Sequence, residues 1–149
     1  MVPTVEWIQG AVRLLDQSRL PEHVEFLDCR DYRAVADAIR ELKVRGAPAI
    51  GVTAALGVAL GAQAIPATEF TAFAQALLPI CDHLAATRPT AVNLFWAIDR
   101  MKTKLASLSA QAVPAVKAAL LAEAQAILEE DIALCKAMGR HGAELIANG

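Results

Sequence analysis

This sequence of 149 residues has little excess of either positive or negative charge. Lysine and arginine together number 14 and aspartate and glutamate 16, which gives a net charge of -2. Proteins that bind nucleic acids usually carry a basic face, because the phosphate backbone is a dense line of negative charge. The composition therefore argues against a nucleic-acid partner, while a small anion could still be held by a local cationic site.

Cysteine and histidine are also sparse, at three residues each. Cys29, Cys81 and Cys135 stand far apart, without the C-x-x-C spacing that zinc sites use. Each lies in an apolar segment, so we expect inert core thiols, no metal and a reducing cytoplasm. The glycine motifs typical of nucleotide-binding loops are missing too, which argues against a nucleotide cofactor.

Apolar residues are abundant, at 56% of the total, and much of this fraction is alanine, which favours closely packed helices. Short, partly alternating runs predict a small β-sheet in residues 1–30, and helical spacing governs residues 31–149. We therefore expect one α+β, predominantly helical domain over residues 1–149, with about five helices. The runs Val5–Ile8, Ala11–Leu15 and Val24–Leu27 predict a sheet of two or three strands. The expected helices follow Asp31, begin at Pro48, follow Thr68, begin near Arg88-Pro-Thr90, and run from about Gln111 to Met138 with an end at Gly139.

The uncharged stretch from Pro48 to Ala67 is long enough to be tested as a membrane span. It is mostly alanine and glycine, however, and it includes Thr53 and Gln63. Glycines spaced by four residues let helices approach closely in soluble proteins as well as in membranes. We therefore predict a buried central helix and no membrane partner.

The heptapeptide Arg45-Gly-Ala-Pro-Ala-Ile-Gly51 stands at the head of this stretch. It places a cation, a glycine and a proline at a predicted helix start, where unbonded N–H groups and the helix dipole attract anions. A guanidinium beside such a turn is able to hold a phosphate through two parallel hydrogen bonds. The pattern thus favours a phosphate-binding corner, and it equally allows a plain turn whose Arg45 lies in solvent or pairs with Glu41.

A second cationic turn occurs at Thr87-Arg-Pro-Thr-Ala-Val-Asn93. Arg88 precedes a proline and a threonine suited to capping, so we expect it at a helix start as well. Two such arginines suit one phosphorylated small molecule, unless Arg88 instead neutralises Asp82 or simply caps the preceding helix. Asp16 and Gln17 either form a polar wall of a site or fix the turn that follows them. No nucleophile beside a general base stands out, so the residues alone describe a binding unit without a reaction centre.

Several short elements occur in a recognisable order and spacing along nearly the whole chain. They are Val5-Glu-Trp7, Leu15-Asp-Gln-Ser-Arg-Leu-Pro21, Val44-Arg-Gly-Ala-Pro-Ala-Ile-Gly51, Arg88-Pro-Thr-Ala-Val-Asn-Leu94, Trp96-Ala-Ile98 with Arg100-Met101, and Met138-Gly-Arg-His-Gly142. In combination they resemble the N-terminal region of the S-methyl-5-thioribose-1-phosphate isomerase family, the aldose–ketose isomerases of methionine salvage. Each element alone would be a weak signal.

The resemblance implies an N-terminal half that is mostly helical with a small sheet, a Rossmann-like C-terminal half, and a homodimer. It implies that the enzyme converts S-methyl-5-thioribose 1-phosphate to S-methyl-5-thioribulose 1-phosphate without a cofactor or metal, with Arg45, Gly46, Ala47 and Arg88 touching the substrate. The family's catalytic cysteine and aspartate would lie beyond Gly149. No residue of this chain is therefore expected to be catalytic, and the chain alone is expected to be inactive.

The same superfamily offers two other functions. One is the isomerisation of ribose 1,5-bisphosphate. The other is a non-catalytic regulatory or assembly role, as in the subunits of the eukaryotic initiation-factor exchange complex. The Leu-Asp-Gln and Arg-Pro-Thr-Ala-Val-Asn-Leu elements are more similar to the methylthioribose enzymes than to either of these.

Overall fold

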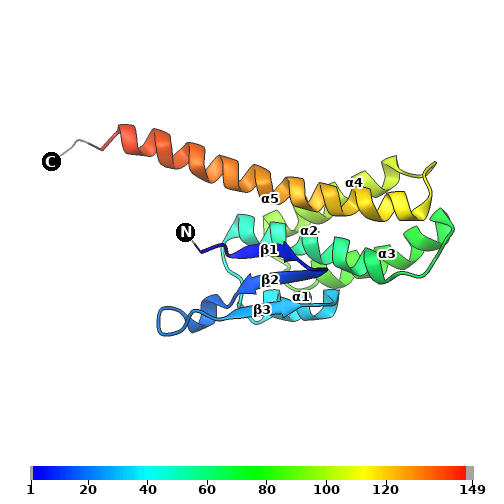
Figure 1. Ribbon diagram of the computed structural model, residues 1–149, viewed down its shortest axis with the longest axis horizontal. Coiled ribbons are helices and arrows are strands. Elements are labelled where there is room, and N and C mark those ends of the chain that lie inside the picture. The colour runs from blue at the N-terminus through cyan, green and yellow to red at the C-terminus, as the bar shows by residue number, and fades with distance from the viewer. Residues whose placement is uncertain (1, 147–149) are drawn as a thin grey trace.

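The computed structural model describes residues 2–146, in which a small antiparallel sheet lies against five helices (Figure 1). The elements are β1 (Val5–Ile8), β2 (Ala11–Leu15), β3 (Phe26–Cys29), α1 (Tyr32–Arg40), α2 (Ala47–Ala64), α3 (Phe70–Ala85), α4 (Val92–Ser107) and α5 (Val113–Glu144). A short 3-10 turn, Gln17–Arg19, follows β2. The predicted α+β, predominantly helical class is confirmed.

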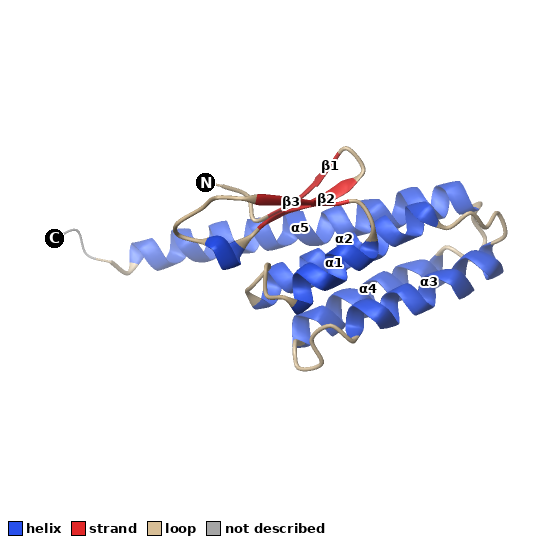
Figure 2. Ribbon diagram, turned by 90° about the horizontal axis from the view of Figure 1, so that it is seen from below, coloured by secondary structure: helices blue, strands red, loops and turns tan. Residues whose placement is uncertain are grey.

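The sheet has the order β1-β2-β3, so β2 pairs with a neighbour on each side. β1 and β2 are joined by a tight turn in which Gln9 and Gly10 both have positive φ, 49° and 74°. Val12 and Leu14 share one face of β2, are completely buried and belong to the main hydrophobic core, so this face packs on the helices. Ala11 and Leu15 on the other face are buried as well. The strands lie along one side of the helices, where β1 and β2 contact α2 (Figure 2).

Helix α2 is the centre of the fold and contacts each of the other helices. It is the one helix in the described residues that is long and apolar enough to cross a membrane, and 72% of that stretch is buried inside the protein. A Cβ on Gly57 would lie 2.9 Å from Val35 Cγ1, and one on Gly61 would lie 2.8 Å from Ile80 Cγ2. These glycines therefore seat α1 and α3 against α2, as expected for a buried central helix.

Several predicted boundaries were wrong. Glu69, not Thr68, is the N-cap of α3, and β3 lies two residues later than predicted. Helix α4 starts at Val92 rather than near Arg88, because residues 88–91 form a turn first. Helix α5 continues through Gly139 to Glu144, since Gly139 does not adopt the positive φ that a terminating glycine needs.

The cysteines also divide differently from the prediction. Cys29 and Cys81 are buried, and their burial raises the pKa of each thiol to about 11. Cys135 is exposed on α5, so the prediction of a core thiol was wrong at that position.

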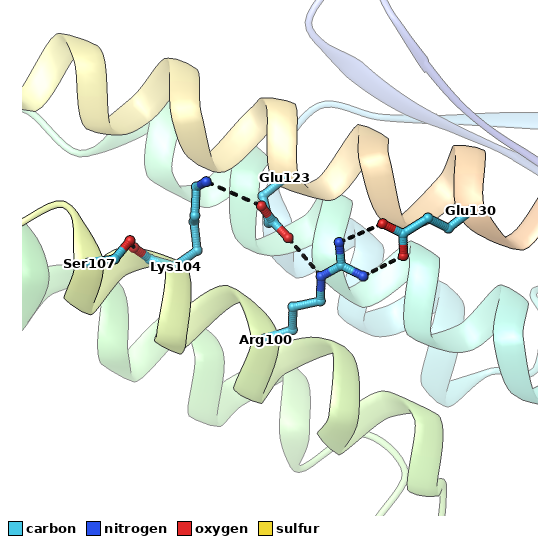
Figure 3. A network of polar contacts seen from close by, with 5 residues as sticks. All are labelled: Arg100, Lys104, Ser107, Glu123 and Glu130. Atoms are coloured by element: carbon cyan, nitrogen blue, oxygen red, sulfur yellow. Dashed lines mark hydrogen bonds and ion pairs between the residues drawn. The ribbon is translucent and has the colours of Figure 1, made fainter.

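An ion-pair network joins α4 to α5 (Figure 3). Arg100 Nε lies 2.7 Å from Glu123, and its Nη2 donates to Glu130 at 2.8 Å. Lys104 adds a 3.4 Å pair with Glu123. Hydrogen bonds from Arg100 lower the pKa of both carboxyl groups and raise the pKa of the guanidinium. The network fixes α5 beside α4, and α5 then runs on past the other helices (Figure 1).

Candidate functional site

A pocket of about 460 Å³ opens where the start of α2 faces the turn before α4. It brings together all four predicted substrate-binding residues, Arg45, Gly46, Ala47 and Arg88. The rest of its lining consists of apolar and neutral polar residues, Leu42, Ile50, Thr90, Ala91, Val92 and Asn93. Among the described residues, two arginines and no acidic residue line this cavity, so the formal charge of its lining is positive.

The start of α2 supplies backbone donors to this pocket. Gly46 is the N-cap with φ 99°, a left-handed conformation that favours glycine, and Pro48 lies in the first turn. The first bond at this end runs from Ile50 N to the Gly46 carbonyl at 3.0 Å. Among the described residues, the N–H groups of Gly46 and Ala47 have no backbone partner, so they remain free for an anion.

Neither arginine is taken up by the carboxylate that could have neutralised it. Glu41 pairs with Lys43 at 2.8 Å, and Asp82 pairs with Lys102 at 3.1 Å. Arg45 Nε donates to the Leu42 carbonyl at 3.0 Å, which leaves both terminal nitrogens without a partner in the described residues. The ion-pair alternatives were therefore wrong.

Arg88 is half-buried in a turn that is fixed from both sides. The preceding Thr87 is buried, and its hydroxyl donates to the Leu84 carbonyl at 2.6 Å. The Arg88 carbonyl accepts from Ala91 N at 3.0 Å. Thr90 lines the pocket and does not cap α4, whose N-cap is Ala91, so the predicted capping role was wrong.

Gly51 brings the two halves of the pocket together, a role that the sequence reasoning missed. A Cβ at this position would lie 2.7 Å from the carbonyl oxygen of Asn93 and 3.5 Å from Ala97 Cβ. Only a residue without a side chain allows the start of α4 to lie this close to α2. The signal was present, because Gly51 closes the heptapeptide that begins at Arg45.

Asp16 and Gln17 fix local backbone. The buried Asp16 carboxylate accepts from Ser18 N at 3.0 Å and caps the 3-10 turn. Gln17 donates twice to the loop before α2, from its backbone N to the Lys43 carbonyl at 2.8 Å and from Nε2 to the Arg45 carbonyl at 3.3 Å. Gln17 does not line the pocket; it holds the segment that does.

The arrangement is suited to binding, and it offers no acid–base pair. No histidine, cysteine or carboxylate lines the pocket. The described residues also contain no group of three or more such side chains placed to hold a metal ion. A second pocket of about 330 Å³ shares Asn93 with the first and is largely apolar, with Trp96 and Leu134 in its wall.

The fold and the pocket define a mostly helical domain with two arginines in a pocket at the start of its central helix. Residues 43–149 match the Initiation factor 2 subunit family, and the chain belongs to that family.

Two curated relatives of the chain carry the same name. The chain is 56% identical over 147 residues to a methylthioribose-1-phosphate isomerase of Syntrophotalea carbinolica, covering 99% of this chain and 43% of the relative. It is 53% identical to one of Geobacter metallireducens, with 98% and 42% covered. The chain therefore spans less than half the length of the curated relatives it matches.

Two solved structures share the fold over the whole chain. One is 5-methylthioribose 1-phosphate isomerase from Pyrococcus horikoshii OT3, with a TM-score of 0.96, 36% identity and 42% of that chain covered. The other is the translation initiation factor eIF-2B, subunit delta, from A. fulgidus, with a TM-score of 0.89, 40% identity and 43% covered.

Proposed function

We propose that this chain is the substrate-binding N-terminal part of a methylthioribose-1-phosphate isomerase, and that its pocket holds the phosphate of the sugar. One observation supports this most directly: Arg45, Gly46, Ala47 and Arg88 line a single cavity without a carboxylate. The names of the relatives supply the substrate class, since the matched region covers 98–99% of this chain.

The pocket would contribute position rather than proton transfer. An aldose 1-phosphate carries its phosphate on the anomeric oxygen, so the ring opens only with acid assistance before hydrogen moves from C2 to C1. Arg45, Arg88 and the free N–H groups of α2 would fix that phosphate, and with it the two reacting carbons. The acid and the base would come from residues outside this chain, so the chain alone should not catalyse.

The test is Arg45→Ala and Arg88→Ala in the enzyme that contains this chain. We expect each to raise KM and to lower kcat/KM by about tenfold or more, because each removes a charge-assisted contact to the phosphate. Arg40→Ala is the matched control, since Arg40 is an exposed arginine on α1 that pairs with Asp37. Unchanged kcat/KM in both pocket variants would remove the pocket from the substrate site.

A non-catalytic assembly role is the second candidate, favoured by the structural likeness to the A. fulgidus initiation-factor subunit. Assays of the intact protein that contains this chain, with S-methyl-5-thioribose 1-phosphate and with ribose 1,5-bisphosphate, separate the possibilities. Turnover of the first alone supports our proposal, turnover of the second identifies the related isomerase, and turnover of neither favours assembly.

The remaining features of the proposal concern the whole protein. We infer a Rossmann-like second domain, a homodimer and a cytoplasmic location from the likeness to the longer isomerases. Native mass spectrometry of the intact protein measures its oligomeric state, and cell fractionation measures its location. A monomer would contradict the inferred homodimer, and a membrane-bound pool would contradict the cytoplasmic location. Neither result would bear on the proposed role of the phosphate pocket.

A further inference from the structure

The loop that carries Arg45 has an unusual backbone at both of its ends. Leu42 has φ 60° and Gly46 has φ 99°, so the chain takes a left-handed conformation at both ends of the loop. Left-handed conformations are costly for a residue with a branched side chain such as leucine, so something must hold the loop in place. Val44 is completely buried and anchors the middle of the loop, whereas Arg45 and Gly46 are exposed, so burial alone does not fix the Arg45–Gly46 peptide.

Hydrogen bonds from Gln17 supply the restraint. Its backbone N and its Nε2 donate to the Lys43 and Arg45 carbonyls at 2.8 and 3.3 Å. Gln17 is in turn held by the 3-10 turn that Asp16 caps. A side chain that lies outside the pocket thus controls the peptide between the first two residues of the phosphate-binding segment.

Control of this peptide sets the direction of the Gly46 N–H. A peptide unit is planar and trans, so its carbonyl and its N–H point in opposite directions. The Arg45 carbonyl points to Gln17, and the Gly46 N–H therefore points away from it. Gly46 lines the pocket and Gln17 does not, which is the arrangement needed for the N–H to serve an anion.

We propose that Gln17 is a positioning residue of the phosphate pocket, which orients the Arg45–Gly46 peptide so that the Gly46 N–H donates to the bound phosphate. This inference rests on the proposed function of the pocket. It assigns a role to the Asp-Gln pair beyond fixing its own turn, and the role acts through the backbone of another segment.

The experiment is a titration of the 15N-labelled protein with inorganic phosphate at constant ionic strength, followed through the amide resonances of Gly46 and Ala47. Gln17→Met removes the Nε2 donor and keeps the length of the side chain; Gln17→Ala repeats the test with a smaller one. Gln63→Met is the matched control, because Gln63 Nε2 donates to the Lys117 carbonyl at the same 3.3 Å, at the far end of α2. Thermal unfolding of each variant is recorded alongside.

In the Gln17 variants we expect a shifted Gly46 resonance without phosphate. We also expect an affinity for phosphate about three- to tenfold lower, the size expected from loss of the one neutral hydrogen bond from Gln17 Nε2 that orients the peptide. Gln63→Met should bind like the wild type even if its melting temperature falls equally. Normal affinity in the Gln17 variants, or equal losses in the Gln63 variant, would overturn the positioning role and leave the proposed function intact. If phosphate shifts neither the Gly46 nor the Ala47 resonance of the wild type, and Arg88→Ala leaves kcat/KM of the enzyme unchanged, then both the proposed phosphate pocket and this inference are wrong.

Discussion

Gly51→Ala should disturb the pocket, because the added methyl group meets the backbone at the start of α4. The new Cβ would lie 2.7 Å from the Asn93 carbonyl oxygen, which must retreat by roughly 0.7 Å to reach the 3.4 Å of ordinary contact. The obstacle is backbone, so no side-chain rotation relieves it. Overpacking of this kind costs about 1–3 kcal/mol, and the higher helix propensity of alanine returns about 1 kcal/mol of it. We therefore expect a net loss of about 1 kcal/mol in the free energy of unfolding.

A matched control isolates the clash from helix propensity. Gly139 also lies inside a helix, and a Cβ there would meet nothing within 4 Å. Gly139→Ala should therefore raise the free energy of unfolding by about 0.5–1 kcal/mol. The two variants should differ by about 2 kcal/mol, a gap of about 6 °C in melting temperature for a chain of this size. Circular dichroism at 222 nm measures both values.

The same clash should also weaken the binding of phosphate. Asn93 lines the pocket from the start of α4, so its retreat moves one wall away from Arg45 and the start of α2. We expect Gly51→Ala to bind phosphate more weakly than Gly139→Ala at temperatures where both are folded. A Gly51→Ala protein that melts at or above the Gly139→Ala protein would refute the argument, because the close approach of α2 and α4 would then impose no constraint.

Two further predictions concern charge and thiol chemistry. Arg100→Ala should lower the free energy of unfolding at pH 7 by about 1–2 kcal/mol, since it breaks charge-assisted bonds that are partly exposed. Arg100 lowers the pKa of Glu123 below its ordinary 4.5, so this contribution is present above pH 4.5 and lost as the pH falls through the lowered pKa. Denaturant titrations from pH 7 to 3 should accordingly give a shallower decline for Arg100→Ala, and equal slopes would contradict the assignment. With iodoacetamide at pH 8, Cys135 should react in the native protein while Cys29 and Cys81 react only after unfolding, because their pKa values are raised to about 11. Labelling of all three native thiols, measured by intact mass, would show that the burial is not maintained.

Features that depend on nearby residues were predictable from the sequence. Asp31 caps α1 as predicted, with its carboxylate accepting from Arg33 N and Ala34 N at 2.8 and 3.0 Å. β1 and β2 lie within their predicted bounds, because alternation over a few residues identifies a half-buried strand. The start of α2 was equally local, since glycine and proline each favour their observed positions at a helix N-terminus.

Features that depend on distant residues were not predictable. The position of β3 is set by its pairing with β2, in which Arg13 opposes and binds Asp28 at 2.7 Å. A glycine ends a helix when it adopts a positive φ, and the sequence does not show which φ Gly139 adopts. The continuation of α5 through Gly139 was therefore not predictable. Arg45 and Arg88 line one pocket, but the sequence does not reveal the close packing at Gly51 that brings their segments together.

The exposure of the pocket limits the affinity that this chain alone has for phosphate. An exposed ion pair contributes about 0.2–1 kcal/mol and a helix N-terminus about 0.3–1 kcal/mol, so two arginines and the start of α2 supply about 1–3 kcal/mol. A dissociation constant of 1 mM requires about 4 kcal/mol, so the free chain should hold inorganic phosphate no more tightly than the millimolar range. Burial of the same contacts would strengthen them, because a lower dielectric raises the energy of each charge-assisted bond. Under the proposed function, the half-buried Arg88 and the exposed Arg45 would form one wall of the site, and its affinity for phosphate would rise once a second surface covers it.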